Sequence, residues 1–197
     1  MFSGIVEETL LINHIEHHSD DLKISIVPSF ISDCFLGQSI AVQGVCLTVC
    51  EINECISFYL SPETLSKTNV SNWHLGAMVN IERSLEFGGR VDGHLVSGHV
   101  DGLIQIESII KQGEAFEVTF NLSNSNQQKL IYPKGSIAID GISLTINDMD
   151  ALNFKVMIIP HTWSVTSAKN WQVGQYVHVE FDTMAKIIDH QLNLRDN

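Results

Sequence analysis

Short runs of alternating hydrophobic and polar residues dominate the chain. In one run Phe116, Val118, Phe120 and Leu122 are separated by single polar residues. Successive side chains of a strand point to opposite faces, so these four share one face. Similar runs, rich in Val, Ile, Thr and Phe, are separated by turn-forming residues such as Gly37, Asn53, Pro62, Asn72 and Gly76. The pattern predicts many short β-strands, arranged as small closed antiparallel barrels.

The pattern of the first half recurs in the second. The segment 39–49 (SIAVQGVCLTV) matches 136–146 (SIAIDGISLTI) without a gap, 97 residues later. Residues between 62 and 82 match those between 160 and 180, and the run 3–7 matches 97–101. Three collinear matches predict a tandem duplication. Repeats can also serve packing alone.

The repeat divides the chain into three expected parts. The glycine-rich stretch 87–93 suits a connection between modules. We therefore predict one barrel over residues 1–90 and a second over 91–182. Residues 183–197 lie outside the repeat, and Met184, Ile187, Ile188 and Leu192 fall on one face of a predicted helix there. That helix is free to serve assembly.

Composition narrows the class of protein. The 197 residues are 44% hydrophobic and 17% charged, with a formal net charge of −12. An acidic chain without a basic stripe disfavours nucleic-acid binding. No stretch approaches the roughly 18 apolar residues of a membrane span, and the first residues do not resemble a secretion signal. We expect a cytoplasmic protein without membrane partners, whose four cysteines are free thiols.

Polar side chains recur on one face of two matched strands. Cys46, Thr48 and Cys50 share a side in the first copy, as do Ser143 and Thr145 in the second. They could bind the edges of a flat heterocycle or simply face solvent, and their paired occurrence favours a ligand site. Gly44 and Gly141 interrupt the matched segments at one position, which indicates a bulge or a close approach of ligand to backbone.

Two histidines and two aspartates are further candidates. His94 and His99 lie five residues apart, which on a strand puts them on opposite faces, and no nearby motif completes a metal-ligand set. We expect no metal; proton transfer, substrate contact and a structural role stay open for both. Asp140 and Asp182 stand where the first copy has other residues, which suits two sites with different proton-transfer groups or reflects neutral drift. Phosphate loops, dinucleotide fingerprints and nucleophile elbows are absent from the sequence.

Several ordered motifs resemble the alpha-type riboflavin synthase family. They are MFSGIVEE at 1–8, GVCLTV at 44–49, SPETL at 61–65, GHLVSGHVDG at 93–102, KGSI at 134–137, DGISLT at 140–145 and IPHT at 159–162. Together they span nearly the whole chain. One mild departure is His178, at a position where the family usually has Asn.

The resemblance implies two tandem six-stranded Greek-key β-barrels plus a C-terminal helix. Each barrel would bind one 6,7-dimethyl-8-ribityllumazine. The two molecules would exchange a four-carbon unit, giving riboflavin and 5-amino-6-ribitylaminouracil without a cofactor. The subunit would form a homotrimer in which the first barrel of one copy faces the second barrel of its neighbour. Association with lumazine synthase stays open.

Site residues follow from the matched motifs. Contacts in or beside the first barrel are expected from Gly4, Ile5, Val6, Cys46, Leu47, Thr48, Pro62, Glu63 and Thr64. Contacts around the second are expected from Gly98, His99, Val100, Lys134, Ser143, Leu144, Thr145, Ile159, Pro160, His161 and Thr162. The catalytic candidates are Phe2, Ser39, Cys46, His94, His99, Asp140, Ser143 and Asp182.

Two other readings remain. A non-catalytic lumazine- or flavin-binding antenna protein could use the same scaffold, although such proteins usually lose the paired Gly-His motif or the second-copy DGxSLT, and both are intact here. A barrel without any small ligand would leave the matched polar faces unexplained. Conversion of the lumazine to fluorescent riboflavin distinguishes all three.

Overall fold

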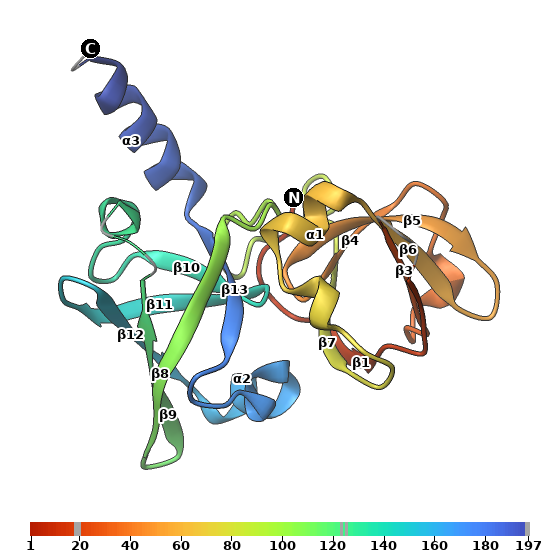
Figure 1. The fold of residues 1–197 in the computed structure, drawn as a ribbon, viewed down its shortest axis with the longest axis horizontal. Coiled ribbons are helices and arrows are strands. Elements are labelled where there is room, and N and C mark those ends of the chain that lie inside the picture. The colour runs from red at the N-terminus through yellow and green to blue at the C-terminus, as the bar shows by residue number, and fades with distance from the viewer. Residues whose placement is uncertain (18–20, 123, 125, 196–197) are drawn as a thin grey trace.

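The computed structural model describes residues 1–17, 21–122, 124 and 126–195. Two β units lie side by side, and helix α3 (Thr183–Arg195) extends away from the second unit (Figure 1). The predicted all-β fold with two homologous barrels and a C-terminal helix is confirmed. None of the helices in these residues is long and apolar enough to cross a bilayer.

The two units repeat one order of elements. The first contains β1 (Glu8–Leu11), β2 (His14–His17), β3 (Leu22–Ile26), β4 (Ser39–Val42), β5 (Val45–Ile52), β6 (Ile56–Leu60), α1 (Pro62–Lys67) and β7 (Met78–Arg83). The second contains β8 (Gly102–Gln112), β9 (Ala115–Asn121), β10 (Ser136–Ile139), β11 (Ile142–Met149), β12 (Asn153–Ile158), α2 (Pro160–Val165) and β13 (Tyr176–Phe181). Short 3-10 helices cover Ile31–Asp33, Val70–Asn72, Gln127–Leu130 and Ser167–Asn170.

The sheets differ in one strand. The second unit is a closed barrel in the order β10-β11-β12-β9-β8-β13. The first follows the same order, but the counterpart of β8 is split into β1 and β2, which form the two ends of a seven-stranded sheet. Only Ile12 and Asn13 separate these halves, so the chain itself joins the ends. Each unit thus has six strand positions. The divisions at residues 90 and 182 stay predictions.

Alternation fills both barrels with apolar side chains. Along β5, Val45, Leu47 and Val49 point into the first core, and their counterparts on β11 point into the second. Phe58 lies in the first core with no exposed surface, as Phe120 does in the second. Burying such side chains contributes about 1.5–3 kcal/mol each. The barrels are packed solid, so a ligand must bind outside the cores.

The glycines at the matched position form turns and not bulges. Gln43 and Gly44 both have positive φ, 50° and 80°, and so do Asp140 and Gly141, 49° and 79°. Two successive positive φ values are typical of a tight type I′ hairpin, here joining β4 to β5 and β10 to β11. A Cβ on Gly44 would lie 2.5 Å from the Gly141 nitrogen. The expectation of a bulge or a bound ligand here is therefore wrong, because the close approach is between the two hairpins.

A buried hydrogen-bond network joins the hairpins. Asn80 donates through Nδ2 to the Asp140 carbonyl (2.9 Å) and accepts through Oδ1 from the Ser167 amide (2.7 Å). His178, at the matched position, bonds through Nδ1 to the Gln43 carbonyl (2.9 Å). Its Nε2 accepts from the Asn69 amide (3.1 Å). The imidazole reproduces both carboxamide contacts, which explains how this departure from the family is accommodated.

Two chain segments, residues 2–6 and 94–100, cross between the barrels. These crossing segments pair around Phe2 and Val96 as a short antiparallel ribbon. Phe2 and Val96 exchange backbone hydrogen bonds of 2.7 and 3.0 Å, and the His94 amide donates to the Ser3 carbonyl (3.0 Å). Phe2 is fully buried against Ala41, Val96 and Ala138. The ribbon therefore connects the two barrels and brings residues from one repeat beside the other.

Candidate functional site

The first candidate site lies where β5 separates from β6. These strands pair only from Val49 onward, so the edge of β5 before that residue needs another partner. The segment after Val96 supplies it, because the Cys46 amide donates to the Gly98 carbonyl at 2.8 Å. A Cβ on Gly98 would lie 2.6 Å from that of Cys46. Only glycine permits so close an approach.

A cavity of about 420 Å³ opens at this edge, on the outside of the first core. Its lining combines a thiol, an imidazole, two hydroxyls and one charge of each sign; it includes Val45, Cys46, Glu63, Thr64, Lys67, Thr68, Gly98, His99 and Val100. Mixed apolar and polar walls suit a small heterocycle with hydrogen-bonding edges.

The second candidate site repeats this construction. The Ser143 amide donates to the Gly4 carbonyl (2.7 Å), and Val6 packs on the second core. Ser143 Oγ also lies 2.7 Å from Nδ1 of His94. Burial lowers the pKa of His94 below its ordinary value of 6.5, while the negative charges of Asp182 and Glu180 act in the opposite direction. The lowered pKa favours the neutral imidazole of His94 at pH 7, a form that can accept a proton.

In the structure, two segments each lie at the barrel opposite to the one expected. Segment 98–100, expected at the second barrel, lines the cavity of the first, and Val100 packs against the first core. Segment 4–6, expected at the first barrel, contacts Ser143 and the second core instead. The placement was wrong because each repeat's leading segment covers the open strand edge of the other repeat.

Side chains on the matched polar face point away from the cores. Thr48 and Thr145 are exposed, whereas Cys46 and Ser143 are half-buried beside the crossing segments. Leu47 and Leu144 point inward and fill the cores. Of these strand residues, Cys46 and Ser143 are therefore placed to offer side chains to a ligand.

Three other catalytic candidates are absent from the lining of the first cavity. Phe2 packs between the barrels, where Cys46 lies against it, and half-buried Ser39 pairs with Thr48 across β4 and β5. Asp140 is 2% exposed, and its carboxylate accepts from the His178 amide and Trp171 Nε1, both at 2.9 Å. Burial raises the pKa of Asp140, and its oxygens are committed to the contact between barrels. Exposed Lys134 sits in the turn before β10, where its amide donates to the Ile146 carbonyl.

Asp182 lies at the start of α3, close enough to His94 to influence its charge. Its Oδ1 accepts from the Met184 amide at 2.8 Å, which satisfies a free donor of the helix end. The structure thus brings His94 and Ser143 into contact, and the negative charge of Asp182 acts on that histidine.

The expected turns after β6 and β12 are short helices. Helix α1 places Glu63 and Thr64 in the first cavity. Helix α2 holds Pro160, His161 and Thr162 at the matched place in the second unit, and Ile159 precedes it. A Ser before Pro62 is a typical helix start, with Pro at the first helical position. This signal could also have identified Lys67, which lies one turn further along.

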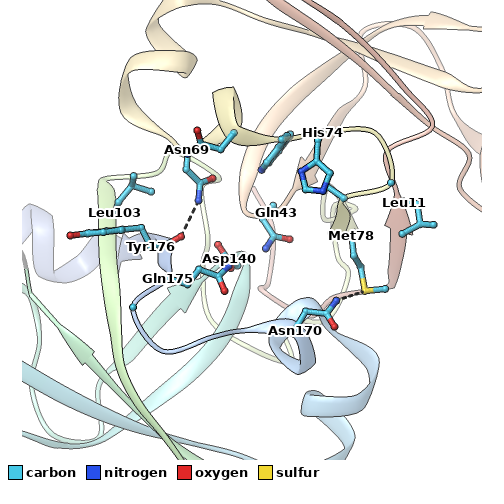
Figure 2. A pocket seen from close by; sticks show the side chains of 15 residues that line it. Leu11, Gln43, Asn69, His74, Met78, Leu103, Asp140, Asn170, Gln175 and Tyr176 are labelled. Carbon is cyan, nitrogen blue, oxygen red and sulfur yellow. Dashed lines mark hydrogen bonds between the residues drawn. The ribbon is translucent and has the colours of Figure 1, made fainter.

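A larger cavity of about 730 Å³ lies between the barrels on the hairpin side (Figure 2). Carboxamides from both repeats line it, among them Gln43, Asn69 and Asn170. Asn69 Nδ2 donates to the Tyr176 carbonyl at 3.0 Å. Of the catalytic candidates only Asp140 borders it, and that carboxylate is already bonded. This cavity is larger than the one beside Cys46, but its lining does not favour it as the reactive site.

Comparison with known proteins agrees with this duplicated geometry. The chain matches the lumazine binding domain family over residues 3–84 and 97–182. It is 40% identical to riboflavin synthase of Chlamydia muridarum over 188 residues, covering 95% of this chain and 92% of that protein. Identity to the Saccharomyces cerevisiae riboflavin synthase is 38%, covering 98% and 87%.

Solved structures show the same fold. LumP complexed with riboflavin superposes with a TM-score of 0.83 at 23% identity, covering 92% of this chain and 99% of that one. LumP complexed with 6,7-dimethyl-8-(1'-D-ribityl) lumazine gives 0.82 at 20% identity, with the same coverage. The two stretches that match the lumazine binding domain correspond to the two repeats of this chain. The chain belongs to the lumazine binding domain family and, within it, to the riboflavin synthases.

Proposed function

We propose that the chain converts two molecules of 6,7-dimethyl-8-ribityllumazine into riboflavin and 5-amino-6-ribitylaminouracil. One observation carries the proposal: a single ribbon gives one histidine to each of two matched sites. His94 contacts Ser143 of the second barrel, and His99 lines the cavity beside Cys46 of the first. Two equal reactants that play different chemical roles need two such related but unequal sites.

The chemistry begins with loss of a proton from the 7-methyl group of one lumazine. Neutral His94, bonded to Ser143 Oγ at 2.7 Å, suits this proton transfer at the second barrel. At the first barrel, Cys46, Thr64 and His99 can bond to the edges of the other lumazine. The four-carbon unit then moves from one ring system to the other. Because one molecule loses the four carbons that the other gains, no outside carbon donor is required.

The two sites of one chain lie at opposite ends of the ribbon. From His94 to Gly98 an extended segment spans roughly 13 Å, at about 3.3 Å per residue. Reacting atoms must approach within about 3–3.5 Å. We therefore infer that a lumazine on one copy reacts with a lumazine on the opposite barrel of another copy.

We infer that helix α3 serves in the assembly of several copies of the chain. It projects from the second barrel (Figure 1), and Met184, Ile187, Ile188 and Leu192 are each more than half exposed. A homotrimer arranged through this helix accounts for an apolar surface of that kind. Sedimentation should give three copies, and removing residues 183–197 should reduce both the assembly and the turnover. The expected cytoplasmic location and any association with lumazine synthase stay predictions.

Incubating the protein with the lumazine tests the function. Two lumazines should disappear for each riboflavin formed, with one pyrimidine product released. A protein that binds the lumazine without forming riboflavin would instead be an antenna-type binding protein, the alternative suggested by the fold it shares with LumP. That result would overturn the proposed enzyme and leave the sites intact.

A further inference from the structure

Two buried glutamates hold the crossing segments in the same manner. Glu82 on β7 and Glu180 on β13 are 5% and 4% exposed. The Glu82 carboxylate accepts from the Ser3 amide (2.6 Å), Ser3 Oγ (2.8 Å) and the Gly4 amide (3.0 Å). Each of these bonds has a counterpart at the second glutamate.

The Glu180 carboxylate accepts from the Ser97 amide (2.6 Å), Ser97 Oγ (2.7 Å) and the Gly98 amide (2.8 Å). Hydrogen bonds to a charged acceptor are shorter and stronger than neutral ones. Three such bonds on each carboxylate fix the orientation of both backbone segments.

The segment held by each glutamate forms the wall of the opposite site. Gly4, bound to Glu82 of the first barrel, accepts through its carbonyl from the Ser143 amide of the second. Gly98, bound to Glu180 of the second barrel, accepts from the Cys46 amide of the first. In each glycine the amide is held by one barrel and the carbonyl by the other.

Burying a carboxylate is costly unless hydrogen bonds to it compensate for the lost water. Burial raises the pKa of Glu82 above its ordinary value, although the three donors from Ser3 and Gly4 act in the opposite direction. A carboxylate kept at such a position stabilises a specific arrangement of its donors.

We propose that Glu82 and Glu180 are crossed positioning residues: Glu180 sets the geometry of the first-barrel site, and Glu82 sets that of the second. This rests on the proposed function in taking the Cys46 and Ser143 surfaces as ligand sites. A substitution in one barrel should therefore impair ligand binding mainly on the other barrel.

Amide hydrogen exchange tests the crossed positioning without any ligand. In Glu180→Gln the shape of the side chain is kept, but its NH₂ group meets donors where an oxygen accepted them. The Cys46 amide should exchange on the order of tenfold faster, and the Ser143 amide should change less than about twofold. Glu82→Gln should give the reverse pattern. Each variant controls the other, since general loosening of the fold accelerates both amides equally and would overturn the proposal.

Alkylation of Cys46 extends the test to binding. Iodoacetamide labelling, followed by peptide mass spectrometry, measures how strongly riboflavin protects this thiol. Half-protection should need on the order of tenfold more riboflavin in Glu180→Gln, which corresponds to about 1.4 kcal/mol, and less than about twofold more in Glu82→Gln. Equal shifts in both variants would refute crossed positioning.

The proposed function and crossed positioning can be refuted independently of each other. If riboflavin does not protect Cys46 in the unmodified protein, the proposed ligand site is wrong, while hydrogen exchange still decides whether the glutamates act across the barrels. If riboflavin protects Cys46 and Glu180→Gln leaves that protection unchanged, the function stands and crossed positioning is refuted.

Discussion

The two barrels share a scaffold and differ at the surface that would meet a ligand. At the first site Cys46 lies beside His99, Glu63 and Lys67, so charges of both signs border the cavity. At the second, Ser143 is bonded to a half-buried histidine whose charge is influenced by Asp182. The first site resembles a polar binding surface, and the second resembles a proton-transfer site.

The difference shows how a duplicated fold can serve two roles. The elements that build both sites are kept in pairs: the type I′ hairpins, the crossing glycines and the glutamates that hold them. The groups that would contact a ligand have diverged. Variants that alter only the shared scaffold, or only the ligand-facing groups of one site, therefore separate the two contributions.

The largest expected effect separates the two histidines. His94→Ala should lower kcat on the order of 10²–10³-fold, because it removes the proposed acceptor of the 7-methyl proton. His99→Ala should mainly raise KM, since His99 is an exposed wall residue without a resolved partner for its ring. Steady-state and single-turnover riboflavin formation measure both. Equal losses of kcat in the two variants would remove the asymmetry between the barrels.

How far the sequence predicts this molecule depends on what a repeat encodes. Strand alternation and the matched segments predict two barrels, and the motif 93–102 identifies both histidines. The repeat does not predict which barrel each leading segment covers. The match of 3–7 to 97–101 shows that the two segments are equivalent in sequence, but it does not show which barrel each one contacts. The edge of β5 before Val49 is unpaired because β6 pairs with β5 only from that residue onward. The pattern of side chains along the two strands does not define this register.

The same limit applies to Asp140. Asp140 occupies the position that Gln43 has in the first copy, a difference that in the sequence fits either a proton-transfer group or neutral drift. The fold instead turns that side chain toward Trp171 and the His178 amide, because position 140 belongs to the hairpin between barrels. Only the three-dimensional packing shows that the hairpins at the matched positions, with Gly44 and Gly141, contact each other.

The next effect concerns the contact between the two hairpins, one from each copy of the repeat. Gly44→Ala should destabilise the protein by about 2 kcal/mol more than Gly76→Ala, since the added Cβ at residue 44 meets the Gly141 backbone. Gly76 has the same φ of 80° but nothing within 4 Å of an added Cβ, so it reports the backbone strain alone. Urea unfolding midpoints measure the difference. Similar losses would show that the hairpin contact contributes little.

The effect of the conservative change at position 178 is smaller, and it tests the equivalence of Asn80 and His178. His178→Asn should cost less than about 1 kcal/mol, because Asn80 already makes both matching bonds at its own position. His178→Phe fills the space but leaves the Asn69 amide and the Gln43 carbonyl without this partner, at a cost of about 1–3 kcal/mol for each group. Chemical denaturation at pH 7 compares them. Equal stability of the two variants would contradict the network.

The smallest effect concerns pH and the second site alone. Burial lowers the pKa of His94, so the acid limb of the kcat/KM profile should lie below pH 6.5. Asp182 opposes this lowering through its negative charge, so Asp182→Asn should move the limb further toward acid. Asn can still accept from the Met184 amide, which keeps the start of α3 intact. His99→Ala should leave the limb in place, because His99 lies at the other barrel. A limb that moves toward alkaline pH in Asp182→Asn would mean that a different group carries the proton.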